Sequence, residues 1–134
     1  MTVTLPPNST APAPKLQPTG WLRYLSFSVD HKVIGLQYLV CGFVFYLIGG
    51  ALAGAIRTEL ASPVADFMAR DVYNQVLTLH GTVMIFLWIV PVVNGAFGNY
   101  LIPFYVGARD MAFPRLNAVA FWLIPPAGLM LVAS

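Results

Sequence analysis

The 134-residue sequence is 58% hydrophobic and only 9% charged, with a mean hydropathy of +0.74. Soluble domains are about 25% charged, so this composition excludes an ordinary soluble domain and indicates a membrane protein. The formal net charge of +2, without a Lys/Arg cluster, argues against a nucleic-acid partner. The single cysteine, Cys41, lies in an apolar run and is expected to be a small packing residue.

The first 32 residues form the polar part of the chain. Residues 1–20 contain five prolines with Ser, Thr and Asn, so they are expected to form a disordered tail. Residues 21–32 mix aromatic side chains with cations and are expected to lie at the membrane surface, with residues 28–32 supplying capping and charge just before the first apolar run. His31 lies among these polar residues and is expected to be solvated or at headgroup level.

Three apolar stretches predict three transmembrane helices, hence an all-α, polytopic helix bundle. Residues 33–56 exceed the ~20 residues that span the hydrocarbon core. A second helix is expected over about 73–93, followed by a packed or re-entrant turn where Gly, Asn and Pro recur up to residue 106. Residues 116–134 begin a third helix, which Pro125 and Pro126 are expected to kink rather than end. The sequence stops inside this stretch, so we expect it to be truncated.

Small residues near the end of the first helix predict close helix contact. Gly50 and Gly54 are four residues apart and lie beside Gly49 and Ala53. Such spacing lets two helix backbones approach, although it is common by chance and identifies no function.

The distribution of cations predicts the orientation. The tail and the loop after the second helix carry five cations, whereas the loop after the first helix carries two. The positive-inside rule therefore places the N-terminus and the 107–115 loop on the cytoplasmic side. His80 then lies toward the outer face, and Asp110 lies at the inner side. The cations counted are Lys15, Arg23, Lys32, Arg109 and Arg115, against Arg57 and Arg70.

His80 is the one histidine inside an apolar stretch, and the sequence has no charge between Asp71 and Arg109. Ionisable groups at membrane depth are costly and usually functional. A neutral imidazole there is a candidate metal ligand. From the residues alone, a hydrogen bond to a neighbouring helix or a wet cavity explains it equally well.

Six blocks of the sequence carry a resemblance when they are taken together. They are Asp30-His31-Lys32, Arg57-Thr58-Glu59-Leu60, Val72-Tyr73-Asn74, the run from His80 to Phe86, the run from Gly98 to Asn117, and the run from Phe121 to Pro126. These blocks resemble the N-terminal quarter of subunit I of haem-copper cytochrome c oxidases. The resemblance covers about residues 26–134 in order. It implies that 33–134 is the truncated start of a twelve-helix transmembrane subunit.

At the outer side, this resemblance implies a haem site. His80 matches an axial ligand of the low-spin haem, and the low charge around it suits a neutral imidazole. Arg57 matches an arginine that hydrogen-bonds a substituent of the same haem, although an interfacial anchor explains it nearly as well. Glu59 matches a carboxylate that in some members binds calcium or sodium, which here is a single ligand without its partners.

At the inner side, the resemblance implies a proton pathway. Asp110 matches the acidic residue at the mouth of the D-type channel, and Asn99 and Asn117 match asparagines that line its entrance. Without the resemblance, a solvated loop charge is the simpler interpretation of Asp110. Two departures matter: Arg109 replaces a common proline and is expected to favour ionised Asp110, and Ala118 replaces a second asparagine.

The implied activity belongs to the whole subunit. It would transfer electrons from cytochrome c through the low-spin haem to a haem-copper centre, reducing oxygen to water with proton pumping, beside subunits II and III. The ligands of the high-spin haem and of copper belong to later helices, so these residues alone cannot reduce oxygen. A quinol oxidase of the same superfamily and a non-enzymatic three-helix membrane scaffold remain open. A bis-histidine cytochrome of the b type is disfavoured, because residues 33–56 and 116–134 contain no histidine.

Overall fold

The computed structural model describes residues 20–61, 63 and 67–134, so the expected disordered tail lies outside the described residues except for Gly20. Within this part every regular element is helical. Three helices are long and apolar enough to cross a membrane: α1 (His31–Glu59), a continuous helix over Arg70–Val106, and α4 (Pro114–Ala133). The predicted all-α fold with three spans is confirmed.

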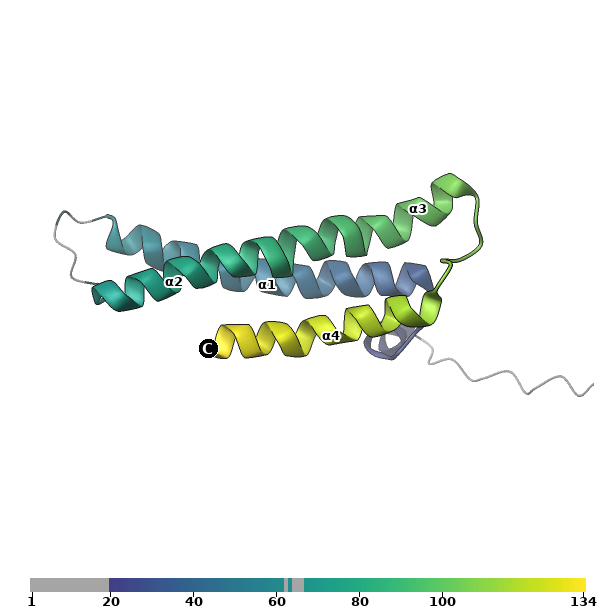
Figure 1. Ribbon diagram of the computed structural model, residues 1–134, viewed down its shortest axis with the longest axis horizontal. Coiled ribbons are helices and arrows are strands. Elements are labelled where there is room, and N and C mark those ends of the chain that lie inside the picture. The colour runs from purple at the N-terminus through teal and green to yellow at the C-terminus, as the bar shows by residue number, and fades with distance from the viewer. Residues whose placement is uncertain (1–19, 62, 64–66) are drawn as a thin grey trace, which may run out of the picture.

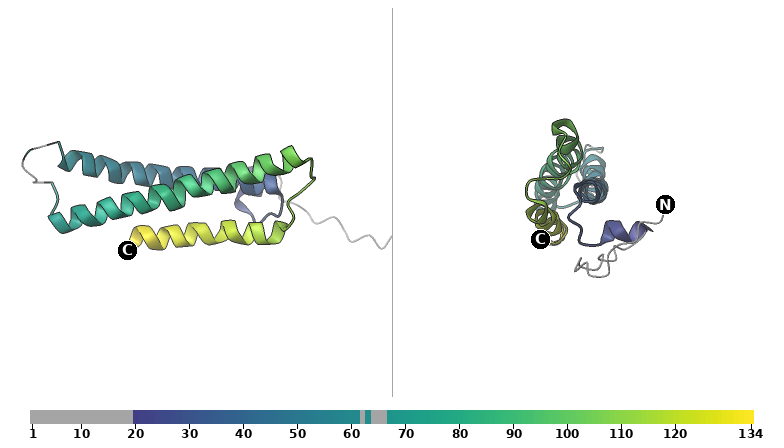
Figure 2. Two further views of the ribbon diagram at one scale, coloured as in Figure 1. Left: turned by 45° about the horizontal axis from the view of Figure 1, so that its top comes forward. Right: turned by 90° about the vertical axis from the view of Figure 1, so that its right-hand side faces the viewer.

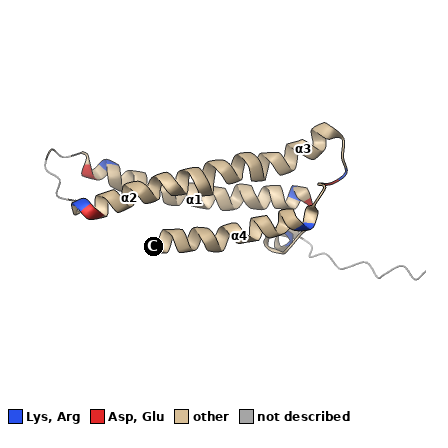
Figure 3. Ribbon diagram, in the orientation of Figure 1, with Lys and Arg blue, Asp and Glu red and all other residues tan. Residues whose placement is uncertain are grey.

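The three spans lie side by side as a bundle with alternating direction (Figures 1 and 2). α1 contacts both other spans along its length, and α4 also contacts the middle of the second span. Charged residues of the described chain gather at the two ends of the bundle, leaving the middle uncharged (Figure 3). This distribution is the one that a hydrocarbon layer requires.

α1 begins and ends with polar contacts. Asp30 is its N-cap, and its carboxylate accepts a hydrogen bond from the Lys32 backbone N–H at 3.0 Å, so the expected capping is confirmed. The helix continues three residues beyond the predicted end and therefore contains Arg57 and Glu59. Before it, a short 3₁₀ helix, η1 (Gly20–Leu25), is tied to α1 by Gln37, whose Nε2 donates to the carbonyls of Tyr24 and Ser26.

The second span corrects the predicted turn after residue 93. The helix starts at Arg70 and continues without interruption through α2 (Arg70–Thr82), η2 (Val83–Ile89), η3 (Pro91–Phe97) and α3 (Gly98–Val106). η2 and η3 are π-helical, with backbone hydrogen bonds that reach five residues back, from Val90 to Ile85 and from Gly98 to Val93. The wider turns accommodate Pro91, which has no N–H to donate.

A membrane explains why the glycines and prolines do not break this helix. Unsatisfied backbone groups are too costly in hydrocarbon, so the helix absorbs these residues by local π adjustment. It ends only at Gly107, whose φ of +70° is left-handed. The N–H groups of Gly107 and Ala108 then donate to the carbonyls of Phe104 and Pro103, which is a Schellman motif.

α4 begins at Pro114, a first-turn position that suits proline because the missing N–H would be unpaired there anyway. It passes through Pro125 and Pro126 without ending, as predicted. Arg115 therefore lies in the first turn of the helix and not in the loop.

The contact between α1 and the second span depends on glycines other than the predicted pair. Gly50 and Gly54 face open space, with no atom of the described residues within 4 Å of a Cβ built there. The close contacts instead occur at every seventh residue, Gly35, Gly42 and Gly49, where a Cβ would lie 3.1, 2.8 and 2.5 Å from the second span. A seven-residue period keeps these glycines on one face of the helix, so the backbones approach along a seam.

Two apolar clusters fill the bundle. One contains Ile34, Tyr38, Ala96, Ala118 and Phe121, and the other contains Phe45, Val83 and Leu87. Cys41 packs against both, which confirms its expected packing role. In each span, at most 22% of the residues in the most apolar 18-residue stretch are buried. Most apolar side chains of the spans therefore face outward from the bundle.

Candidate functional site

The two groups of predicted site residues lie at different levels of the bundle. His80 lies in the last turn of α2, about ten residues or ~15 Å from the helix start. This is deeper than the ~10 Å that follows from a helix beginning at residue 73. Its ring Nδ1 lies 2.9 Å from the backbone carbonyl oxygen of Gly49 on α1. The absence of a side chain at Gly49 allows the two helices to come this close.

This contact determines which nitrogen of His80 is available. A carbonyl oxygen only accepts hydrogen bonds, so Nδ1 must carry the proton. In the neutral ring the lone pair then lies on Nε2. Metal-binding histidines are typically held in this way, with one nitrogen donating to a carbonyl and the other facing the metal. The residues present therefore fit an axial ligand for a haem iron.

Arg57 lies in the last turn of α1, eight residues beyond Gly49 and so ~12 Å farther along the helix. Its side chain is exposed, and within the described part of the chain it forms no ion pair. Arg57 is thus available to a group bound at the His80 level, or to the membrane surface.

Glu59 is buried, with 6% of its surface exposed, and its side chain stabilises the chain that follows α1. Its Oε2 accepts hydrogen bonds from the backbone N–H groups of Phe67 and Met68, at 3.1 and 2.9 Å. The carboxylate therefore ties the connection between the first two spans to the end of α1. Among described residues, no group of three His, Cys, Asp or Glu side chains is arranged for a metal, so the calcium or sodium site stays a prediction.

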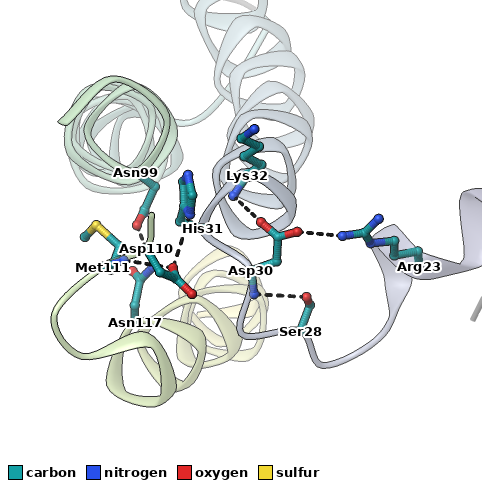
Figure 4. Close-up of polar contacts among 9 residues, drawn as sticks. All are labelled: Arg23, Ser28, Asp30, His31, Lys32, Asn99, Asp110, Met111 and Asn117. Atoms are coloured by element: carbon teal, nitrogen blue, oxygen red, sulfur yellow. Dashed lines mark hydrogen bonds and ion pairs between the residues drawn. The ribbon is translucent and has the colours of Figure 1, made fainter. Parts of the chain in front are cut away.

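At the opposite end, the fold brings together the three residues predicted for proton uptake. Asp110 lies in the loop after α3, Asn99 in α3 and Asn117 in α4. The two amide side chains face each other, and Asp110 lies at the same end of the bundle, paired with His31 (Figure 4). The Asn117 Nδ2 donates to the Asn99 Oδ1, and the Asn99 Nδ2 donates to the Gly95 carbonyl at 2.6 Å. The two amides thus form a short chain that leads from the bundle end into the second span.

His31 belongs to the same cluster, which corrects the expectation of a solvated histidine. It is the first residue of α1, only 7% exposed, and its Nδ1 lies 3.1 Å from the Asp110 Oδ1. The same oxygen accepts from the Met111 N–H at 2.8 Å. Sequence reasoning missed His31 because 79 residues separate it from Asp110. Only the antiparallel return of the second span brings the two together.

Asp110 is neither buried nor a free loop charge. Its side chain is 47% exposed, so it contacts water while one oxygen is held by His31 and the Met111 backbone. Arg109 is exposed, and among the described residues it has no ion-pair partner. Ala118 is fully buried in an apolar cluster, so the position beside Asn117 serves packing here.

Comparisons with known proteins show the family of this chain. Residues 33–134 match the family described as cytochrome c and quinol oxidase polypeptide I. The chain is 65% identical over 114 residues to cytochrome c oxidase subunit 1 of Thermostichus vulcanus, covering 85% of this chain and 21% of that relative. It is 61% identical over 127 residues to the Synechocystis protein of the same name, covering 95% and 22%. A Corynebacterium diphtheriae relative is 43% identical over 129 residues, covering 85% and 23%. The chain spans about a fifth of the length of these curated relatives. It belongs to the cytochrome c and quinol oxidase polypeptide I family.

Proposed function

We propose that this chain forms the N-terminal part of the catalytic subunit of a respiratory terminal oxidase. The whole subunit takes electrons from cytochrome c, reduces oxygen to water and pumps protons. Family membership supports this proposal, as do relatives that carry the name cytochrome c oxidase subunit 1. The high-spin haem and copper of that reaction are held by residues outside this chain.

The contribution of this chain begins with His80. The single observation that carries the proposal is the 2.9 Å contact between its Nδ1 and the Gly49 carbonyl, which would leave the Nε2 lone pair free to bind a haem iron. A low-spin haem bound there supplies one-electron transfer. A haem ligand held by a helix carbonyl cannot rotate freely, which keeps the ligation geometry fixed during electron transfer. Arg57 is proposed to hydrogen-bond a substituent of the same haem.

We also propose that Asp110, Asn99 and Asn117 admit protons. A half-exposed carboxylate exchanges protons with water, and His31 holds it at the mouth of the cluster. The two amides both donate and accept hydrogen bonds, so they can order water molecules that pass a proton inward. Apolar side chains at these positions could not do so.

The proposed orientation places this proton entrance in the cytoplasm. The described cations Arg23, Lys32, Arg109 and Arg115 lie at the Asp110 end, against Arg57 and Arg70 at the other end (Figure 3). The positive-inside rule supports that orientation. The proposed partners are oxidase subunits II and III, cytochrome c and membrane lipid. Glu59 is proposed to offer a carboxylate to a calcium or sodium ion at the outer face.

Replacing His80 tests the haem assignment. In the complete oxidase in its native membrane, His80→Leu is expected to abolish the absorption band of the low-spin haem. Thr78→Val is the matched control, since among the described residues its hydroxyl donates to the Asn74 carbonyl of its own helix and to no other group. A normal low-spin band in His80→Leu would contradict the proposal, and a stable chain free of haem in that membrane would favour a scaffold.

A quinol oxidase is the second candidate, because the family includes quinol oxidases. Turnover of the purified oxidase with reduced cytochrome c, but not with a quinol, is expected. The reverse result would assign the chain to the quinol branch.

A further inference from the structure

A groove beside the first turns of α1 is separate from the His80 site and from the Asp110 cluster. It has a volume of about 610 Å³ and lies between η1, the first turns of α1 and the region where η3 meets α3. Its rim is polar and includes Arg23, Asp30 and Lys32. Its wall is apolar and includes Leu36, Leu39, Phe97 and Leu101.

We propose that this groove binds one anionic phospholipid, with its phosphate at the rim and an acyl chain along the wall. The proposal depends only on the membrane position of the bundle, not on the haem or on proton uptake. Three observations support it: the charge at the rim, the fixed position of the rim, and the depth of the wall.

The rim carries an excess positive charge. The Arg23 guanidinium is paired with the Asp30 Oδ2, and Asp30 also caps α1 (Figure 4). Lys32 is exposed, and within the described chain its ammonium forms no ion pair. Two cations and one carboxylate leave a net charge of +1, which complements a phosphodiester. A basic residue near a membrane surface attracts anionic lipid.

The rim is held in place, unlike a mobile surface charge. Gln37 is 5% exposed, and its Nε2 donates to the carbonyls of Tyr24 and Ser26, at 2.9 and 3.0 Å. These bonds fix η1 and the following turn against α1. η1 lies beside the end of the bundle and exposes Trp21, which is 70% accessible, as an interfacial anchor does (Figure 2).

The wall has the depth that an acyl chain needs. Lys32 and Leu39 are seven residues apart on α1, so the wall descends ~10 Å, about two thirds of the ~15 Å of one hydrocarbon leaflet. Leu36, Leu39 and Leu101 remain 38–39% exposed along it. A polar headgroup site above an apolar wall of this length suits a phospholipid, whose headgroup and acyl chain lie within one leaflet.

Photolabelling of the complete oxidase in nanodiscs tests the proposal. The probe is phosphatidylglycerol with a photoactivatable group in its acyl chain, and labelled peptides are identified by mass spectrometry. We expect label on the α1 and α3 peptides of the groove wall. Unlabelled phosphatidylglycerol should compete about fivefold better than phosphatidylcholine, the factor expected for roughly one basic residue.

Two variants and one control make the result specific. Lys32→Gln should lower labelling about fivefold, and Leu36→Trp should abolish it by filling the wall. Arg115→Gln removes a cation at the same end that does not line the groove, and it should label normally. Equal competition by both lipids, or equal loss in Arg115→Gln and Lys32→Gln, would overturn the proposal.

A photoreactive benzoylphenylalanine at Leu36 provides an independent measurement. It should capture a phospholipid, recognised by its mass. Capture of a polypeptide, either a later helix of the subunit or a partner subunit, would overturn the lipid proposal while leaving the haem assignment intact.

Discussion

The seam glycine Gly49 offers a way to disturb His80 without touching its ring. A Cβ at Gly49 would lie 2.5 Å from the Met84 Sδ and 3.1 Å from the Met84 Cγ. Ordinary contacts are about 3.5–4.0 Å, so Gly49→Ala is short of space by at least about 1 Å. Either Met84 rotates away or α1 and α2 move apart.

The consequence for His80 follows from the hydrogen-bond distance. If the helices separate by about 1 Å, the 2.9 Å contact between the His80 Nδ1 and the Gly49 carbonyl grows to about 3.9 Å, which is no longer a hydrogen bond. Loss of such an orienting partner typically costs about 10–100-fold in metal affinity or activity. We therefore expect Gly49→Ala to weaken haem retention by a factor in this range.

Gly50→Ala is the matched control, because it lies next in sequence and its Cβ would have no atom of the described chain within 4 Å. The measurement is the low-spin haem spectrum of the complete oxidase during titration with apomyoglobin as haem acceptor. A second change, Met84→Ala, should restore haem retention in Gly49→Ala by removing the clash. Identical haem loss from Gly49→Ala and Gly50→Ala would refute the reasoning, since Met84 would then have moved without disturbing the ligand.

Three further predictions concern other parts of the bundle. Asp110→Asn should slow turnover and proton uptake with unchanged haem bands, whereas Asp71→Asn at the other end should not; normal uptake in both would remove Asp110 from the pathway. Gly95→Ala should destabilise the bundle by roughly 1–3 kcal/mol, because its Cβ would clash with the buried Tyr38 ring. Denaturant unfolding measures this, and Gly54→Ala, in open space, should be neutral. Glu59→Ala should leave the Phe67 and Met68 amides without an acceptor, at a cost of about 1–3 kcal/mol. Faster proteolysis of that connection should reveal it, and Glu59→Gln, which keeps an acceptor, should largely prevent it.

Some errors of sequence reasoning share one physical origin. Gly95, Gly98 and Pro103 are turn formers in water, so a turn was the natural expectation after residue 93. In hydrocarbon, a broken helix exposes unsatisfied backbone groups, and the chain instead forms π turns and continues to Val106. The same context made Gly50 and Gly54 a plausible contact pair, although helix rotation points them away from the bundle.

The sequence by itself determined the number of spans and the family, because apolar length and long residue blocks are local properties. It also placed Asp110, Asn99 and Asn117 in one region, although only through a resemblance. The tertiary structure decided which distant groups meet: His31 with Asp110, His80 with the Gly49 carbonyl, and Gly35, Gly42 and Gly49 with the second span. These contacts depend on the rotation and register of one helix against another. Side-chain periodicity alone does not determine them, since apolar side chains lie on several faces of these spans.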